Sequence, residues 1–350
     1  MSQNRTDIAE LGEFGLIDKL TSPVRHYHNT TILGAGDDAA VISIGEQERL
    51  LLSTDTLVEG VHFDLSYVPL RHLGYKAVAV NVSDICAMNG HARQLTVSIA
   101  FSNRFSLQAI EELYAGIYAA CETYHVDLVG GDTTSSLSGL VLTISVTGIA
   151  TANKIAYRKG ANEHDLVVVS GDLGAAYLGL QVLEREKQVF LTNPNIQPDL
   201  DGHDYIIGRQ LKPEARVDVV RILDELGVVP TSMIDVSDGL ASEILHLCKQ
   251  SKLGCQLYNE KIPIDGQASL TAIDFNLDPI TCAMNGGEDY ELLFTINQKD
   301  YDLVRSNPNF TVIGHMTAPG SGQYLVDKNG SMVEIQAQGW NHFREQSTDS

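Results

Sequence analysis

Apolar residues along the chain follow two different spacings, and stretches of the two kinds alternate. Recurrence every three or four positions predicts amphipathic helices, whereas short runs rich in Val, Ile and Leu predict strands. The predicted helices cover residues 13–20, 73–88, 107–124, 172–183, 213–226 and 240–248. The predicted strands cover residues 38–44, 50–54, 95–101, 126–129, 140–149 and 166–169. This alternation indicates an α/β (α+β) protein.

The predicted elements fall into two series separated by a short polar stretch at residues 151–153. A chain of 350 residues, at about 150 residues per domain, has room for about two domains. We therefore expect an N-terminal domain over residues 1–150 and a C-terminal domain over residues 151–350. The acidic segment 193–204 contains two prolines and is predicted to be a surface loop, because apolar periodicity resumes after it.

Charge and cysteine content narrow the class of protein. The chain has 24 Lys and Arg against 45 Asp and Glu, a net charge of -21, which repels nucleic acids and anionic lipid surfaces. No apolar run approaches the roughly 18 residues of a membrane helix. The five cysteines include no C-x-x-C pair, so neither a zinc site nor a disulfide framework is indicated. We expect a cytoplasmic protein with no nucleic-acid or membrane partner.

Acidic residues occur beside Gly, Ser or Thr at the ends of apolar strands or inside apolar helices. These segments are Gly34-Ala-Gly-Asp-Asp38, Ser53-Thr-Asp55, Ser83-Asp84, Gly130-Gly-Asp132, Asp235-Val-Ser-Asp238 and Gly286-Gly-Glu-Asp289. Asp84 shares a predicted helical face with Leu73, Ala77 and Val80. An ionised carboxylate on such a face is costly unless a cation or hydrogen bonds compensate it. One alternative is a buried Asp84 satisfied by backbone or serine donors.

Carboxylates and hydroxyls without clustered His or Cys select hard cations, and Mg²⁺ is usually held by a few carboxylates together with substrate phosphates. Asp55 and Asp132 are expected to end strands, where α/β proteins place ligand-binding groups. The sequence therefore predicts a magnesium-dependent enzyme that acts on phosphates. It contains no P-loop, and the Gly34–Ala39 match to a dinucleotide fingerprint is outweighed because a strand-like alternation follows it.

Taken in chain order, the motifs resemble those of the thiamine-monophosphate kinase family, in the superfamily that includes aminoimidazole ribonucleotide synthetase and selenophosphate synthetase. The resemblance rests on Gly12-Glu-Phe-Gly-Leu-Ile17, Gly36-Asp-Asp-Ala39, Ser53-Thr-Asp-Thr-Leu-Val58, His62-Phe63, Lys76-Ala-Val-Ala-Val-Asn-Val-Ser-Asp84, Gly130-Gly-Asp-Thr-Thr134, Arg158-Lys-Gly160, Ile234-Asp-Val-Ser-Asp-Gly-Leu240, Gly286-Gly-Glu-Asp-Tyr-Glu-Leu292, Ile313-Gly-His-Met316 and Gly339-Trp-Asn-His-Phe343. These motifs span most of the chain.

The resemblance implies a two-domain aminoimidazole ribonucleotide synthetase-like fold, with a mixed sheet and helices in each domain, and a homodimer formed through the N-terminal domain. It implies ATP-dependent phosphorylation of thiamine monophosphate to thiamine diphosphate. It further implies that several Mg²⁺ ions bind Asp38, Ser53, Thr54, Asp55, Asp84, Asp132, Asp235 and Asp238, that ATP contacts Gly131, Asp132, Arg158 and Ser237, and that thiamine monophosphate contacts His62, Glu288 and Trp340.

This reaction joins two anions, so the metal ions are expected to neutralise charge and align the reacting oxygens. The attacking phosphate oxygen is already ionised near pH 7, because its second pKa is about 6. We therefore expect direct in-line transfer with no phosphoenzyme and no residue acting as general base.

Other interpretations remain. An aminoimidazole ribonucleotide synthetase-like enzyme is one, and a non-catalytic divalent-cation scaffold is another, although the acids lack EF-hand spacing. Selenophosphate synthetase is disfavoured because the first cysteine is Cys86. Taken singly, Asp238 suits a helix cap, His62 a surface loop, and Trp340 a core position.

Overall fold

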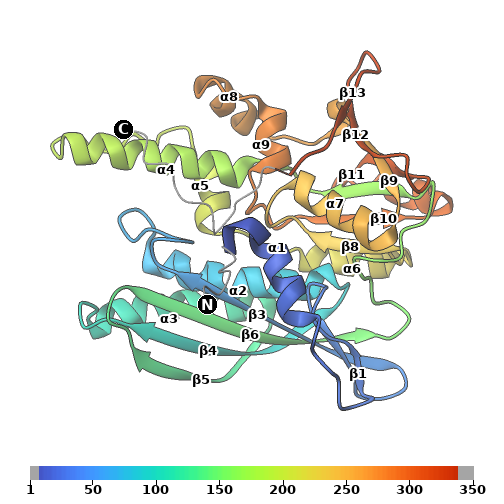
Figure 1. Cartoon of the computed structure of the whole chain (residues 1–350). Coiled ribbons are helices and arrows are strands. Elements are labelled where there is room, and N and C mark those ends of the chain that lie inside the picture. Colours follow the sequence, from blue (N-terminus) through green and yellow to red (C-terminus); the bar gives the residue numbers. More distant parts are fainter. Residues whose placement is uncertain (1–7, 338–350) are drawn as a thin grey trace, which may run out of the picture.

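The chain forms two β-sheets with helices around them, and the computed structural model describes residues 8–337. One sheet is built from residues 31–151 and the other from residues 166–334. In Figure 1 the first, in blue to green, lies below the second, in green to red. The predicted mixed α/β architecture is confirmed, and none of the described helices is long and apolar enough to cross a membrane.

The N-terminal sheet has six strands. In spatial order they are β1 (Thr31–Leu33), β2 (Ala40–Ser43), β3 (Glu48–Val58), β6 (Leu140–Thr151), β4 (His91–Phe101) and β5 (Asp127–Ser135). All neighbours pair antiparallel except β4 and β5, which are parallel. Side chains of β6 alternate between buried and half-buried, as expected for a sheet with one covered face.

Helices α2 (Leu70–Ala87) and α3 (Leu107–Tyr124) cover that face. The two helices approach closely at glycines: a Cβ on Gly74 would lie 2.0 Å from the carbonyl oxygen of Leu113, and one on Gly116 would lie 1.9 Å from that of Arg71. Helix α3 begins after Ser106, whose side chain accepts a hydrogen bond from the Ala109 N–H, as a typical N-cap does.

The C-terminal sheet has seven strands. In spatial order they are β13 (Met332–Glu334), β12 (Gln323–Val326), β9 (Gly254–Tyr258), β11 (Phe310–Thr317), β7 (Leu166–Ser170), β10 (Leu292–Ile296) and β8 (Ser232–Asp235). Only β12 and β9 are parallel. The α-helices outside the N-terminal sheet are α1 (Ile8–Thr21), α4 (Ala175–Thr192), α5 (Asp204–Leu211), α6 (Val217–Leu226), α7 (Leu240–Ser251), α8 (Gly266–Asp274), α9 (Pro279–Asn285) and α10 (Tyr301–Val304).

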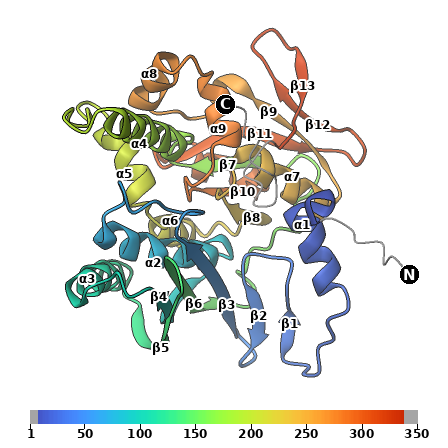
Figure 2. The same cartoon turned by 60° about the vertical axis from the view of Figure 1, so that its left-hand side comes forward.

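Helix α2 lies between the two sheets, as Figure 2 shows. One core contains α2 and α3 together with Phe294 of β10 and Val219 of α6. The opposite face of the C-terminal sheet, including Leu293, packs against α7 and α9 in a second core. Because α2 contacts both β3 and β8, buried polar side chains on it can meet groups from both sheets.

Several predicted boundaries are wrong. Strands β3 and β5 continue to Val58 and Ser135, so Asp55 and Asp132 lie inside strands, because pairing with β6 and β4 continues past them. Helices α4 and α6 begin later than predicted, and α5 was not predicted. The predicted helix over residues 107–124 coincides with α3.

Candidate metal and phosphate site

Three carboxylates from distant parts of the chain converge between the two sheets. Asp38 precedes β2, Asp84 lies on α2 and Asp235 ends β8, and one oxygen from each lies within 4.8 Å of the others. Asp38 and Asp235 are buried, whereas Asp84 is partly exposed. Their ligand atoms are hard oxygens only, which is the chemistry that Mg²⁺ prefers in proteins.

Helix α2 holds this cluster through three polar residues close together in sequence. Ser83 Oγ donates to Asp235 Oδ2 at 2.5 Å. Asn81 is buried, and its Oδ1 accepts from the Asp55 N–H at 3.1 Å. Asp84 accepts from Ser53 Oγ at 2.5 Å. One turn of α2 thus connects β3 and β8. Neither Asn81 nor Ser83 is among the predicted ligands, although each is a polar residue within an apolar helix.

Strand β3 brings Ser53 and Asp55 to the same face. Leu51 and Leu57, two residues before and after this pair, are buried, so the four side chains share the face that α2 covers. The site therefore brings together the predicted residues Asp38, Ser53, Asp55, Asp84 and Asp235.

Burial and mutual repulsion raise the pKa values of these acids. Burial, followed by the charges of Asp55, Asp235 and Asp38, raises the pKa of Asp84 well above its ordinary value. Burial and the Asp38 charge raise the pKa of Asp235 to about 7 and also raise that of Asp55. A divalent cation would relieve this repulsion, so the residues present fit a magnesium site.

Arg158 supplies positive charge at one side of the cluster. Its Nη2 and Nε donate to the two Asp38 oxygens at 2.6 and 3.2 Å. Its backbone N–H donates to both carboxylate oxygens of Asp37 at 3.2 Å. Burial and the neighbouring Asp38 raise the pKa of Asp37 to about 7. Asp37 is a further acid of this site that sequence reasoning did not select, although it is adjacent to Asp38.

Thr54 and Asp132 do not join the cluster. Thr54 lies on the opposite face of β3 from Asp55 and accepts from Ser145 Oγ at 3.0 Å. Asp132 is exposed on β5, paired with Ser98 of β4. Two strands, β6 and β4, lie between β3 and β5, so three strand spacings, about 14 Å in all, separate β5 from β3. Their assignment as metal ligands stays a prediction. Gly131, beside Asp132, packs tightly: an added Cβ would lie 1.9 Å from the Val97 carbonyl oxygen.

The loop between β8 and α7 carries Ser237 and Asp238. The Ser237 carbonyl accepts from the Glu288 N–H at 2.6 Å, and the Asp238 N–H donates to Glu243 at 2.9 Å. The residue that precedes α7 is Gly239, so Asp238 is not the helix cap considered above. This loop therefore joins the Asp235 end of the cluster to the segment containing Glu288.

The residues predicted to contact thiamine monophosphate lie on different segments. Glu288 accepts from Lys76 Nζ at 2.9 Å and from Gln210 Nε2 at 2.7 Å. His62 lies in the turn after β3, and its Nδ1 accepts from the Val58 N–H at 3.0 Å. Trp340 lies outside the described residues.

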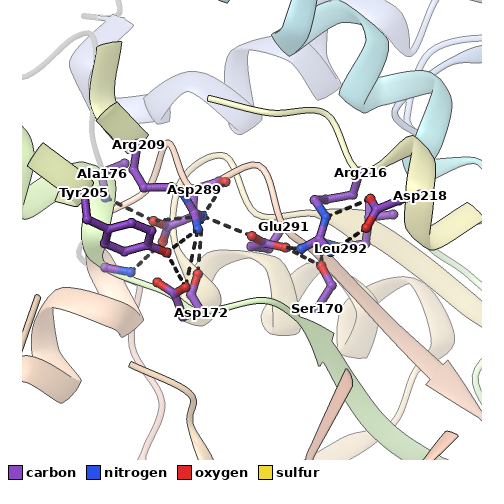
Figure 3. Close-up of polar contacts among 11 residues, drawn as sticks. Ser170, Asp172, Ala176, Tyr205, Arg209, Arg216, Asp218, Asp289, Glu291 and Leu292 are labelled. Carbon is purple, nitrogen blue, oxygen red and sulfur yellow. Dashed lines mark hydrogen bonds and ion pairs between the residues drawn. The ribbon is translucent and has the colours of Figure 1, made fainter. Parts of the chain in front are cut away.

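Next to Glu288, a buried charge network anchors the start of β10. Figure 3 shows Arg209 of α5 among Asp172, Asp289 and Glu291, and Arg216 between Asp218 and Glu291. Asp289 also accepts from the Gly174 and Ala176 N–H groups at 2.7 and 3.3 Å. Burial raises the pKa of Asp289 to about 7, although Arg209 acts in the opposite direction. The network fixes the segment on which Glu288 lies.

Family comparisons define the class of this two-sheet protein. Residues 36–151 match the family described as AIR synthase related protein, N-terminal domain, and residues 162–326 match the corresponding C-terminal domain. The solved hydrogenase maturation protein HypE has 18% identity and a TM-score of 0.67 over 89% of this chain and 95% of its own, and it shares the fold alone. The chain is thus an AIR synthase related protein.

Full-length relatives narrow the family. The thiamine-monophosphate kinase of Bacillus subtilis is 32% identical over 95% of this chain and 100% of its own, and that of Escherichia coli K12 is 33% identical over 95% and 98%. A solved structure described as AaThiL complexed with AMPPCP and TMP has 31% identity and a TM-score of 0.82, covering 97% of this chain and 100% of its own. The chain belongs to the thiamine-monophosphate kinase family.

Proposed function

We propose that this protein transfers the γ-phosphoryl group of ATP to thiamine monophosphate and releases thiamine diphosphate and ADP. The observation that carries the proposal is the convergence of Asp38, Asp55, Asp84 and Asp235 from four separate segments between the sheets. Further support comes from the relatives named thiamine-monophosphate kinase and from the relative described in complex with an ATP analogue and TMP.

The proposed metal is Mg²⁺, bound as several ions by Asp38, Ser53, Asp55, Asp84 and Asp235, with Thr54, Asp132 and Asp238 as further predicted ligands. When bound, the metal supplies charge neutralisation and stabilises charge on the phosphoryl group in transit. The carboxylates keep their positions through Ser53, Asn81 and Ser83, so the site is organised before substrates enter.

The reaction needs no base from the protein. An ionised oxygen of the acceptor phosphate forms a bond to the γ-phosphorus of ATP, and the bond from that phosphorus to the β,γ-bridging oxygen breaks, so the electron pair leaves with ADP. We propose that this transfer is direct and in line. Rapid-quench analysis with γ-labelled ATP should show label in thiamine diphosphate only, and label accumulating on an aspartate would contradict direct transfer.

The proposed ATP contacts are Gly131, Asp132, Arg158 and Ser237. Arg158 already uses Nε and Nη2 for Asp38, which leaves Nη1 as the guanidinium nitrogen with no bond to a described residue. A planar guanidinium fixed in this way suits a phosphate oxygen. His62, Glu288 and Trp340 are the proposed contacts for thiamine monophosphate.

Three broader expectations stay predictions: the domain boundary near residue 150, a cytoplasmic location and a homodimer formed through the N-terminal domain. For the homodimer, the uncovered face of the N-terminal sheet offers a surface, because Leu52 of β3 and Val129 of β5 are 40% and 61% exposed.

The test is an assay of ADP release and thiamine diphosphate formation from ATP and Mg²⁺ with thiamine monophosphate as acceptor. Formylglycinamidine ribonucleotide serves as the comparison substrate, because it is the acceptor of the aminoimidazole ribonucleotide synthetase alternative. We expect ADP release when thiamine monophosphate is the second substrate, and none when formylglycinamidine ribonucleotide replaces it. Turnover only with the comparison substrate, or cation binding without turnover, would overturn the proposal.

A further inference from the structure

Lys76 is a buried cation on α2. The residue is 3% exposed, and its Nζ donates to Glu288 Oε2 at 2.9 Å and to the Gln210 carbonyl oxygen at 3.2 Å. Among the described residues, Glu288 is the only carboxylate that forms an ion pair with it. A buried ammonium is costly without such a partner, so the position of Lys76 and that of the Glu288 carboxylate are coupled.

Gln210, at the end of α5, fixes the same carboxylate from a second direction. Its Nε2 donates to Glu288 Oε2 at 2.7 Å, which sets the orientation of the amide because an ionised carboxylate only accepts. Gln210 is 6% exposed, and its Oε1 is buried with no hydrogen-bond partner among the described residues. Buried acceptors normally have a hydrogen-bond partner, so this oxygen is an exception.

Both bonds to Glu288 end on Oε2, and no described residue bonds its Oε1. The Glu288 side chain is 29% exposed, so Oε1 can meet a ligand. A ligand that bonds Glu288 Oε1 must present a hydrogen-bond donor, such as an N–H group. The amino group on a heteroaromatic ring does so.

The backbone at Glu288 is held as firmly as its side chain. Glu288 has φ of 59°, a left-handed conformation that is uncommon outside glycine, and Tyr290 has φ of 52°. The Glu288 N–H donates to the Ser237 carbonyl oxygen at 2.6 Å. Strained backbone kept in place by such contacts is frequent at ligand-binding positions.

The cluster around Lys76 and the metal site lie at different positions along helix α2. Lys76 and Asp84 are eight residues apart, which is about 12 Å along the helix axis at 1.5 Å per residue. We therefore expect a change at Lys76 to leave the arrangement of the carboxylates around Asp84 intact.

We propose that Lys76 and Gln210 are positioning residues that hold the Glu288 carboxylate to accept from the amino group of the acceptor's ring, and that they thereby select this acceptor over phosphate esters without the ring. The inference rests on the proposed function. It adds Lys76 and Gln210, both of which bond the Glu288 carboxylate, as determinants of acceptor specificity.

The experiment compares Lys76→Met, Lys76→Arg and Gln210→Met with the wild type, and Lys299→Met serves as the control because Lys299 is exposed and its side chain is in neither site. The assay measures kcat and KM for thiamine monophosphate and the inhibition constant of the thiazole phosphate that lacks the aminopyrimidine ring. For Lys76→Met we expect KM to rise at least tenfold, kcat to change less than threefold, and the inhibition constant of the ring-free phosphate to stay within twofold of the wild-type value. Lys76→Arg should recover part of the loss.

A merely structural role predicts a different pattern, in which kcat falls and both ligands weaken together. If Lys76→Met does not fold, the test rests on Gln210→Met, because this variant keeps the ion pair between Lys76 and Glu288. An unchanged KM of Gln210→Met for thiamine monophosphate would overturn the inference. If the wild-type protein forms no thiamine diphosphate, the proposed function fails. If the wild type is active and the variants keep its KM, only the inference on Lys76 and Gln210 fails.

Discussion

Replacing Asp84 by asparagine should make the metal-free protein more stable and the enzyme much less active. Asp84, Asp38 and Asp235 lie within 4.8 Å of one another. Two unit charges 4.8 Å apart repel by about 3.5 kcal/mol at an effective dielectric constant of about 20. Asparagine keeps an acceptor for Ser53 Oγ, so the substitution removes the charge and retains the 2.5 Å hydrogen bond.

The expected gain is smaller than the full repulsion, because the metal-free protein also relieves it by protonating one of its acids, whose pKa values are raised. We expect Asp84→Asn to increase the free energy of unfolding by about 1–3 kcal/mol in chelator at pH 8, which for a 350-residue chain corresponds to a rise in Tm of roughly 1–4 °C. In excess Mg²⁺ the wild type should become the more stable of the two proteins, since binding at 1,000 times Kd stabilises the wild type by about 4.1 kcal/mol and the variant loses this effect.

Thermal unfolding in chelator and in Mg²⁺, with phosphoryl-transfer assays on the same samples, measures both effects. Asp302→Asn is the control, because the Asp302 side chain is 81% exposed and lies outside the cluster. An Asp84→Asn protein that is less stable than wild type in chelator and keeps the same Mg²⁺-induced shift would refute the electrostatic argument. Near-normal turnover would refute the assignment of Asp84 to the metal site.

Further predictions concern the charge network and pH. Arg209→Met should lower stability by about 3–5 kcal/mol at pH 8, because the buried Glu291 and Asp289 lose a cation, whereas the exposed Arg221→Met should cost less than about 0.5 kcal/mol; denaturant unfolding compares them. The Mg²⁺-induced rise in Tm should be larger at pH 8 than at pH 6, because the pKa of Asp235, about 7, makes metal binding release protons; an equal rise at both pH values would contradict this. Burial lowers the pKa of His246 to about 4, so its contribution to stability is present above pH 6.5 and is lost as pH falls toward 4. His246→Gln should weaken this acid-induced loss, which is on the order of 2 kcal/mol in unfolding measurements at pH 7.5 and 4.5.

Much of the fold could be predicted from the sequence, because helix and strand periodicity are local properties of the chain. The predicted helix over residues 107–124 coincides with α3, whose Ser106 cap and apolar spacing are both visible in the sequence. Two acids of the candidate metal site could also be selected from the sequence, because Asp84 and Asp55 interrupt apolar segments where an uncompensated charge is costly. The sequence by itself thus determined the fold class and the family resemblance, and it predicted hard-cation chemistry.

Only the tertiary structure decided which of these residues meet. Thr54 and Asp55 are adjacent in the sequence, yet they lie on opposite faces of β3, because successive side chains alternate across a sheet. Whether a face is covered depends on α2 and β8, which pack there from other parts of the chain. Lys76 and Glu288 are 212 residues apart, and no local pattern pairs them. Their contact exists because the segment before β10 and the end of α5 pack against α2, and that arrangement is a property of the whole fold.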